Sequence, residues 1–557
     1  TLEGVYSAPE AVAGDLPRHG VYPTALASLL ERGSPADYHQ AFAYAEQALS
    51  KAMLRRLMLE RLTVDPLAGE TGETLAGEPL DPELERRRRQ LEERLQRLQQ
   101  QLDPSAETAP ETLDLLAEAR AEHEALIRLI RQRSPHFAAL RYPVPLTADQ
   151  ARDLLDERTA LVTYVPLLGD ELAVFVLDRL TLEVVRLPAK PRELASRIAG
   201  YLELLARPED DGWRAVSRDL HRQLFEPVRS RLSPGVESLI LIVDRELAQL
   251  PFESLLAPAG GGIGDRGEER FLIEDFAVSY APSATLLAEL DRLADEQRPE
   301  ELATLLAIGP PAVSPSSSGA PESSRRTWAA YELEGQAVEP LPGAAAEAVS
   351  VARYGGDGTV SRIGPAASES WLRQQPLEAF DVLHFATHGL LSPLSSARSA
   401  LLLTGDAEED GFLQAREISR LHLAADLVVL SACQTVERET PGGDGMQGIA
   451  ESFFHAGAAS VVGSLWQVTD QSSRRLMESF YRHLADGASK TMALRRAKLD
   501  ALADAASRHP AHWAAFVLIG EGAGTLPLAR PASWPRHLGL GILGLCVLGL
   551  TLGYLRR

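Results

Sequence analysis

The sequence predicts a mixed α/β fold, in which a sheet flanked by helices follows an all-α region and precedes one C-terminal transmembrane helix. Three observations support this prediction. In the last third of the chain, apolar runs alternate with helical patterns, as they do in doubly wound sheets. The first third shows the periodicity of amphipathic helices. The end of the chain carries an uncharged stretch of 18 residues, which is long enough to cross a bilayer.

Length and composition limit the possible classes of protein. A chain of 557 residues is too long for a single core, so about two to four structural units are expected. The formal charge of -22 argues against a nucleic-acid-binding protein, because phosphate binding requires a basic surface. Cys433 and Cys546 are the only cysteines, which excludes a disulfide framework and fits a reducing compartment. No cofactor is expected.

Residues 1–135 are predicted to form a helical region. The stretch 34–37 (Ser-Pro-Ala-Asp) has the residues of a helix start, and an amphipathic helix follows it to about Leu62. Leucines recur at helical spacing between 84 and 102, and a second apolar stripe lies between 111 and 133. These segments predict an antiparallel helical hairpin next to a tetratricopeptide-like remnant.

An α/β domain is predicted for residues 136–522. It begins with β-rich runs separated by turn signals, which predict a meander, and it ends with alternating strands and helices. The Pro-, Ser- and Gly-rich stretch 309–338 is predicted to be an exposed loop. The predicted strands lie at 160–165, 172–177, 182–187, 238–243, 276–280, 304–308, 382–386, 427–431, 459–465 and 514–519, and the predicted helices at 191–232, 446–456, 472–484 and 490–506.

Two reactive side chains stand at the ends of two predicted strands. His388 follows the strand at 382–386, and Cys433 follows the strand at 427–431, 45 residues after His388. Because ligands bind at the carboxyl ends of parallel strands, we expect the two side chains to lie near each other. An imidazole beside a cysteine favours the thiolate, which is the nucleophile. The pattern predicts nucleophilic catalysis, with a buried structural cysteine and a simple His-Gly turn as the alternative.

The C-terminal residues are predicted to anchor the protein in a membrane. Residues 523–535 read as a Pro-rich linker, and residues 536–557 contain the uncharged stretch 538–555 with basic residues on both sides. Its glycines favour a membrane span, and the alternative is a buried core helix. Because no secretory signal is seen at the start, we expect a single-pass protein of the cell membrane with a cytoplasmic body.

Several short motifs occur in the order in which one known family has them. Together they resemble the CHAT domain, a caspase-like peptidase domain that is associated with tetratricopeptide repeats and is distantly similar to separase. The resemblance covers roughly residues 150–522 and implies a caspase-hemoglobinase fold and peptide-bond hydrolysis. The motifs are Leu-Pro-Phe-Glu-Ser-Leu at 250–255, Ala-Pro-Ser-Ala at 281–284, His-Phe-Ala-Thr-His-Gly at 384–389, Ser-Ala-Cys-Gln-Thr at 431–435, Ala-Gly-Ala at 456–458, Ser-Leu-Trp at 464–466 and His-Trp-Ala-Ala-Phe at 512–516.

The resemblance assigns catalytic roles to individual residues. It implies that His388, the second histidine of its motif, is the base and that Cys433 is the nucleophile. The backbone amides of Gly389 and Cys433 are the candidates for the oxyanion hole. His384 is expected to pack inside its strand. A metal site made of both histidines and Cys433 is disfavoured, because a strand would direct His384 away from the strand-end site.

Two observations bear on the specificity of such an enzyme. Caspases bind aspartate through arginines, one of which follows the nucleophile, whereas Gln434 stands at that position here. The segment 466–470 (Trp-Gln-Val-Thr-Asp) is similar to a segment of separases, which cleave after arginine, and this similarity implies that Asp470 lines the substrate pocket. Asp470 would otherwise cap the helix that follows it. Asp444, in the glycine-rich loop 441–445, is the second pocket candidate.

The expected function is that of a membrane-anchored CHAT cysteine endopeptidase, which hydrolyses a protein substrate through a Cys-His dyad and favours cleavage after a basic residue. By analogy with relatives, it would act in bacterial signalling or defence. We expect a protein partner or regulator at the N-terminal helices, membrane contact through the C-terminal helix and no nucleic acid. The alternative is a catalytically silent caspase-like scaffold that acts by helical protein-protein recognition.

Overall fold

The structure of the chain is a computed structural model. It describes residues 21–531, except for 63–80, 101–109, 134–141, 143, 168, 244, 258–268, 312–313, 315, 318, 335, 337, 393–395 and 432–447.

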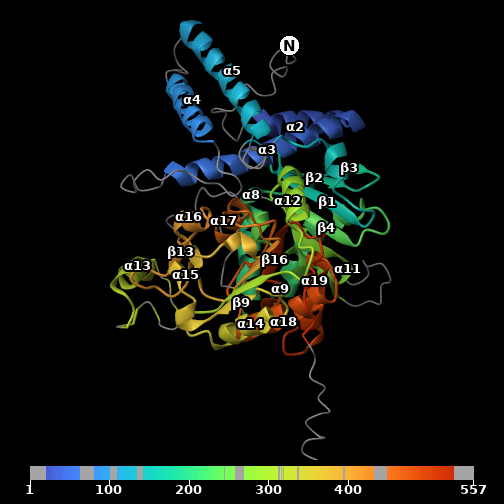
Figure 1. Ribbon diagram of the computed structural model, residues 1–557. Helices are drawn as coiled ribbons and strands as arrows, with labels where there is room; N and C mark the ends of the chain where they lie inside the picture. The colour runs from blue at the N-terminus through green and yellow to red at the C-terminus, as the bar shows by residue number, and fades with distance from the viewer. Residues whose placement is uncertain are drawn as a thin grey trace, which may run out of the picture.

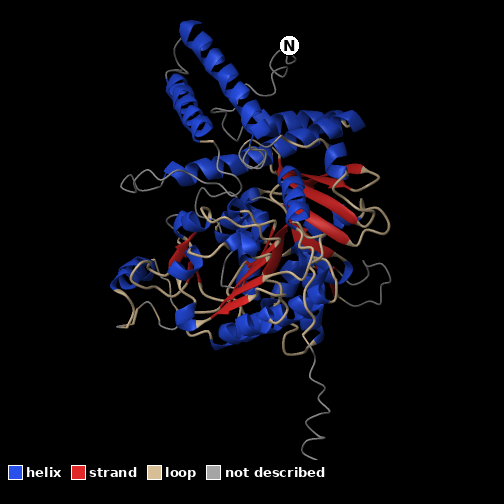
Figure 2. Cartoon of the chain, viewed as in Figure 1, coloured by secondary structure: helices blue, strands red, loops and turns tan. Residues whose placement is uncertain are grey.

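A large mixed sheet forms the centre of the molecule, and helices pack on both sides of it (Figure 2). The strand order is β3-β2-β1-β4-β7-β16-β15-β14-β10-β8-β9. The pairs β1–β2, β2–β3 and β15–β16 are antiparallel, and the other neighbours are parallel. The strands are β1 (Thr159–Pro166), β2 (Glu171–Leu177), β3 (Leu182–Pro188), β4 (Ser238–Ile242), β7 (Ala277–Tyr280), β8 (Leu305–Ile308), β9 (Val360–Arg362), β10 (Val382–Phe385), β14 (Leu427–Leu430), β15 (Ser460–Ser464) and β16 (Phe516–Gly520). The predicted meander and the α/β alternation are confirmed.

Helices and short turns of helix connect these strands. The longer helices that cover the sheet are α8 (Pro191–Leu205), α9 (Trp213–Leu220), α12 (Ala284–Gln297), α14 (Pro342–Ala352), α17 (Ile449–Ala456), α18 (Asp470–Ala485) and α19 (Lys490–Ala503). Shorter ones are α7 (Ala148–Arg152), α10 (Glu226–Arg229), α11 (Leu272–Asp275), α15 (Glu369–Arg373), α16 (Ala415–Ile418) and the π-helical turn His221–Phe225. Two small sheets complete the domain: β5 (Leu256–Ala257) with β6 (Arg270–Phe271), and β11 (Gly389–Leu390) with β12 (Ala400–Leu402) and β13 (Phe412–Gln414).

The meander is apolar on both faces because each face is covered. Successive side chains of a strand point to opposite faces. Tyr164 and Val174 accordingly belong to the main core, whereas Val165 and Phe175 belong to a second core that the N-terminal helices close. Phe42 packs edge-on against Phe175, with ring centroids 5.9 Å apart. Continuous apolar runs in β1 and β2 follow from this double coverage.

The N-terminal region is helical, as predicted. Helices α2 (Val21–Arg32) and α3 (Pro35–Leu62) pack against each other, and α3 contacts α12. Glu46 of α3 is fully buried and accepts hydrogen bonds from the Thr285 amide and hydroxyl at 3.0 and 2.9 Å. This carboxylate lies at the N-terminus of α12, so it joins the helical region to the α/β domain. The predicted hairpin is formed by α4 (Pro82–Gln100) and α5 (Pro110–Arg133), which project from the body (Figure 1).

The stretch 309–338 contains a helix that the composition did not predict. Helix α13 (Glu322–Leu333) packs on the small sheet of β11, β12 and β13. Tyr331 stacks on Phe412 with ring centroids 5.2 Å apart, and Trp328 belongs to the same apolar cluster. Ser324, Trp328 and Tyr331 are buried at helical spacing, but the surrounding Pro, Ser and Gly residues conceal this short stripe.

The predicted single-pass membrane localisation is contradicted. Across the described residues, no helix is long and apolar enough to cross a membrane. A span requires about 20 consecutive apolar residues, whereas the long helices α3, α4 and α5 carry many charged side chains. The stretch 538–555, on which the prediction rested, lies outside the described residues. The predictions of a membrane anchor, a transmembrane helix and membrane contact are therefore corrected: the described residues contain no such helix.

Residues 523–531, the described part of the predicted linker, pack against the α/β domain. The amide of Ala303 donates to the carbonyl of Pro527 at 2.8 Å, and the amide of Ala529 donates to the carbonyl of Tyr354 at 2.7 Å. Leu526 and Leu528 are buried in the main core.

Candidate active site

His388 lies just beyond the carboxyl end of β10. This strand runs parallel between β8 and β14, with Phe385 in register with Ile308 and Leu430. The carbonyl of His388 accepts a hydrogen bond from the Leu402 amide at 2.9 Å, which continues the pairing of β11 with β12. The histidine side chain is 8% exposed. His388 is therefore held by neighbouring strands, at the carboxyl ends of the strands, where open α/β folds bind ligands.

The imidazole of His388 is buried next to hydrogen-bonding and acidic groups. Burial lowers the pKa of His388, since the charged form loses hydration. The backbone of Glu339 acts on this pKa in the opposite direction, as do the charges of Asp470 and Glu339. Because the lowering wins, the neutral imidazole predominates at physiological pH. A neutral imidazole is the form that accepts a proton.

Cys433 lies in the stretch 432–447, outside the described residues, and so do Gln434 and Asp444. The described chain leads toward it through β14, which is the parallel neighbour of β10. Leu430 is in register with Phe385, and Cys433 follows Leu430 by the same number of residues by which His388 follows Phe385. The sequence offset is thus equal on the two neighbouring strands. The pairing of Cys433 with His388 stays a prediction.

The backbone amide of Gly389 is not used in the pairing of β11 with β12. Gly389 faces Leu401, and the neighbouring bond from the Leu402 amide to the His388 carbonyl makes this a non-hydrogen-bonded pair. In such a pair the N–H groups point away from the partner strand. The Gly389 amide therefore points away from β12, as an oxyanion-hole donor would need to do. Its role remains a prediction.

Asp470 lies at the start of α18 and reaches the start of another helix. Thr469, rather than Asp470, is the N-cap of α18, since its side chain accepts from the Ser472 amide. The Asp470 carboxylate instead accepts a hydrogen bond from the Gly343 amide, in the first turn of α14, at 2.5 Å. A carboxylate is stabilised there by the unpaired amides of the helix N-terminus. Its charge also acts to raise the pKa of His388, against the effect of burial.

His384 is part of a buried polar triad between the sheet and helices α14 and α18. Its Nδ1 lies 3.1 Å from the Tyr481 hydroxyl, and its Nε2 lies 3.0 Å from Oε1 of Glu347. All three side chains are essentially inaccessible to solvent. Burial raises the pKa of Tyr481 well above its ordinary value, so the hydroxyl stays protonated. The structural role expected for His384 agrees with these contacts.

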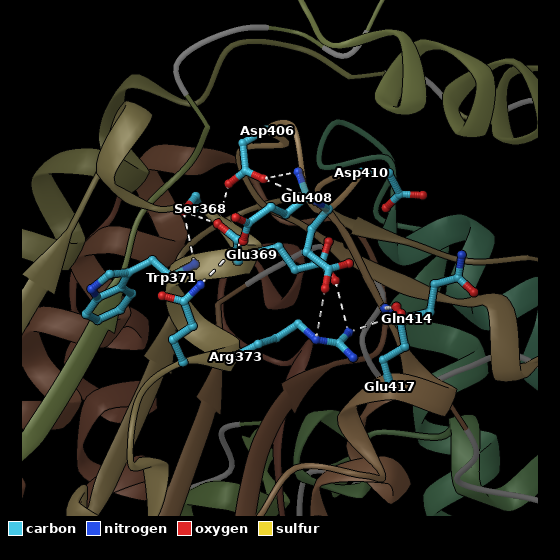
Figure 3. A network of polar contacts seen from close by, with 12 residues as sticks. Ser368, Glu369, Trp371, Arg373, Asp406, Glu408, Asp410, Gln414 and Glu417 are labelled. Carbon is cyan, nitrogen blue, oxygen red and sulfur yellow. Dashed lines mark hydrogen bonds and ion pairs between the residues drawn. The ribbon is translucent and has the colours of Figure 1, made fainter. Parts of the chain in front are cut away.

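A second buried carboxylate lies at the turn between β12 and β13. Glu369 accepts from the Gly411 amide at 2.9 Å and is 1% exposed (Figure 3). Arg373 approaches Glu369, Glu409 and Glu417 within 3.4, 3.3 and 3.2 Å. Burial, followed by the charges of neighbouring carboxylates, raises the pKa of Glu369 to about 8. The composition did not indicate this network, because its members come from three separate segments.

Among the residues that the structure describes, no cluster of three His, Cys, Asp or Glu side chains is arranged to bind a metal ion. Both ring nitrogens of His384 are already occupied by Tyr481 and Glu347.

The sequence of the domain is similar to that of known proteins. The CHAT domain family matches residues 214–521, more than half of the chain. Tetratricopeptide repeat protein 28 of Homo sapiens is 26% identical over 321 residues, which make up 51% of this chain and 12% of that protein. Tetratricopeptide repeat protein 28 of Mus musculus is 33% identical over 109 residues, 20% of this chain and 4% of that protein. The chain thus spans a small part of the length of these relatives.

Solved structures also match this chain. The Saccharomyces cerevisiae separase–securin complex matches with 10% identity and a TM-score of 0.39, covering 88% of this chain and 41% of that one. The Arg-specific cysteine proteinase gingipain R matches with 10% identity and a TM-score of 0.36, covering 60% of this chain and 76% of that one. The family expected from the sequence motifs is confirmed by the match over residues 214–521: the chain belongs to the CHAT domain family.

Proposed function

We propose that this chain is a cysteine endopeptidase in which Cys433 is the nucleophile and His388 is the general base. The observation that carries the proposal is the position of His388, which lies buried and neutral at the carboxyl end of β10. The neighbouring strand β14 continues into the segment with Cys433, and the motifs around both residues are those of the CHAT family. Membership of this family supports a caspase-like peptidase fold.

The proposed reaction has two stages. His388 takes the proton of the Cys433 thiol, and the resulting thiolate attacks the carbonyl carbon of the scissile bond. The amides of Gly389 and Cys433 are the proposed donors to the oxyanion. His388 then protonates the leaving amine as the C–N bond breaks, which leaves a thioester. Water, deprotonated by His388, hydrolyses this thioester and restores the thiol.

We further propose that the substrate is a protein cleaved after a basic residue. Asp470 supports this preference, because its charge acts on the pKa of His388 and one of its oxygens accepts a hydrogen bond from the Gly343 amide. The other oxygen is available for an arginine or lysine side chain of a substrate. Asp444 remains the second candidate for this pocket. A library of peptides that differ only in the residue before the cleaved bond would test the preference, and equal cleavage of all members would refute it.

The proposed catalytic role of Cys433 is tested with matched cysteine variants. Cys433→Ala should abolish cleavage of a peptide library, whereas Cys546→Ala, which changes the other cysteine of the chain, should leave cleavage unchanged. Equal cleavage by the wild type and Cys433→Ala would remove Cys433 from the mechanism. Both variants need the same thermal unfolding midpoint as the wild type for the comparison to hold.

The second candidate function is that of a silent scaffold that binds a protein partner through its helices. The observation in its favour is the α4–α5 hairpin, which projects from the body (Figure 1). Both of its helices are rich in charged residues. A thiol-reactive electrophile distinguishes the two candidates. Labelling of Cys433 that is faster than labelling of Cys546 supports the peptidase, whereas absence of labelling at Cys433 in the folded protein supports the scaffold.

A further inference from the structure

We propose that the end of α13 is a clamp that positions the amide of Gly389, the proposed donor to the oxyanion. This inference rests on the proposed peptidase function, and it assigns a role to a helix that the sequence did not predict. The clamp consists of Tyr331, Glu334 and Gln336, which lie at and just beyond the C-terminal end of α13. These side chains hold the connection between β11 and β12 at both of its ends.

The first end of the connection is held by Gln336. Its Nε2 donates a hydrogen bond at 2.8 Å to the carbonyl of Leu391, the residue that directly follows β11. Its backbone amide donates to the carbonyl of Tyr331 at 3.0 Å, which is the hydrogen bond that closes a helix in a Schellman motif. Gln336 is therefore fixed to the helix, and its side chain ties the strand to α13.

The second end of the connection is held by Tyr331 and Glu334. The hydroxyl of Tyr331 donates to the carbonyl of Arg398, and the carboxylate of Glu334 lies 3.0 Å from the guanidinium of the same residue. Tyr331 is buried, and its ring stacks on Phe412 of β13 with centroids 5.2 Å apart. Because a buried hydroxyl is costly to leave without a partner, this contact resists opening.

The clamp acts on the edge of β11 that faces away from β12. His388 and Leu402 are joined by a hydrogen bond across these strands, so the amide of Gly389 points to the other side. Leu391 follows Gly389 by two residues, and Gln336 binds its carbonyl on that same side. An oxyanion donor acts only when it is held in place before the reaction. A displacement of Leu391 would therefore weaken the donor.

The residue between these two peptide groups also packs on α13. Leu390 is 1% exposed and belongs to the apolar cluster that contains Trp328 and Tyr331. Apolar contacts are non-directional, so they hold the strand against the helix without fixing the direction of its amides. The hydrogen bonds at the two ends of the connection supply that direction. We therefore expect the loss of one hydrogen bond to affect catalysis more than folding.

The first test removes the side-chain amide of Gln336. In Gln336→Ala, kcat should fall about 10-fold, less than the roughly 100-fold or larger loss that follows removal of an oxyanion donor itself. KM should stay within about twofold of the wild type, because the contact acts on the transition state. Glu332→Ala, at an exposed position of the same helix, is the matched control and should keep full activity. Equal kcat values for Gln336→Ala and the wild type would contradict the proposal.

Two further substitutions separate the hydrogen bond from packing. Gln336→Glu has nearly the same shape but no donor, and its carboxylate would face the carbonyl of Leu391, so its loss should at least equal that of Gln336→Ala. Gln336→Lys restores a donor, and its kcat should exceed that of Gln336→Glu. A fully active Gln336→Glu would show that the hydrogen bond has no role in positioning.

A transition-state analogue gives a measurement that a smaller folded fraction does not change. The probe is the best-cleaved library peptide with an aldehyde in place of the scissile amide. The Cys433 thiol adds to it: the S–C bond forms, the carbonyl π bond opens, and the thiol proton passes to the oxygen, which lies where the oxyanion forms. For Gln336→Ala, the inhibition constant should rise by the factor by which kcat/KM falls. A lower kcat with an unchanged inhibition constant would indicate partial unfolding and overturn the clamp.

Hydrogen exchange of the full chain tests the clamp without reference to activity. Peptides that contain residues 388–392 should exchange at least about threefold faster in Gln336→Ala than in the wild type, whereas Glu332→Ala should leave them unchanged. Equal exchange in Gln336→Ala and the wild type would refute the clamp. Faster exchange in a protein that cleaves no peptide would support the clamp and refute the proposed function.

Discussion

Two histidines, one in strand β10 and one just beyond its end, have surroundings that differ in kind. His384, within the strand, has both ring nitrogens occupied by Glu347 and Tyr481. His388, beyond the strand end, is buried, and the charges of Asp470 and Glu339 act on its pKa against the effect of burial. The first histidine is saturated by hydrogen bonds and stabilises the fold. For the second, which lies just beyond the end of the strand, we propose the chemical role.

The largest effect expected from this comparison is on activity at the strand end. His388→Ala should lower peptide cleavage by about 10³-fold or more, because the dyad loses its base. The free energy of unfolding should change little, since the connection between Leu402 and residue 388 is made by the backbone. Cleavage kinetics and thermal unfolding of the same preparation measure both effects. Retention of activity would show that another group is the base.

The next largest effect is on stability within the strand. His384→Ala should lower the free energy of unfolding by about 3 kcal/mol, because it leaves the carboxylate of Glu347 and the hydroxyl of Tyr481 buried without their shared partner. Urea unfolding measures this loss. His422→Ala, at an exposed histidine, is the control and should be neutral. If both variants are equally stable, the triad contributes nothing to the fold.

The next effect is smaller and concerns the dependence of stability on pH. Glu347 is paired with a histidine, whereas Glu369 is a buried carboxyl group that lies among other acids. The pKa of Glu369 is about 8 in the folded protein, above its ordinary value of 4.5, so only the unfolded state releases this proton between these two pH values. Stability is therefore lost as the pH rises through this window. In Glu369→Gln, the loss of unfolding free energy across this pH window should be smaller than in the wild type by on the order of 2 kcal/mol.

The measurement for Glu369 is urea unfolding at pH 5 and pH 8. The wild type should be less stable at pH 8 than at pH 5 by a larger amount than the Gln variant. Equal pH dependence of the two proteins would mean that Glu369 is already ionised in the folded state, with Arg373 as its counter-ion.

The smallest effect concerns a buried carboxylate that bonds only to backbone and hydroxyl donors. Glu46→Gln should cost about 1 kcal/mol, since the amide replaces one of its two acceptor oxygens by a donor that faces the N-terminus of α12. Hydrogen exchange of α2 and α3 should report the loosened contact. Glu31→Gln, at an exposed position of α2, serves as the control. Equal exchange in both variants would exclude Glu46 as the link between the two regions.

Much of the fold was predictable because it depends on local patterns. Strands β10 and β14 end at Phe385 and Leu430, one residue before their predicted ends, and the parallel pairing of these strands agrees with the predicted doubly wound order. Helix α13 was missed, since three buried side chains in a segment rich in Pro, Ser and Gly give too weak a periodic signal. The predicted membrane localisation was wrong for the described residues.

The sequence by itself determined the strands, the place of His388 at a strand end and the family, because periodicity and short motifs are local properties of the chain. Only the tertiary structure decided which groups surround the two histidines. Glu347 reaches His384, and Asp470 reaches Gly343, across long separations in the sequence. Such contacts depend on how helices pack on the sheet, and a glycine at 343 does not show its partner until that packing is known.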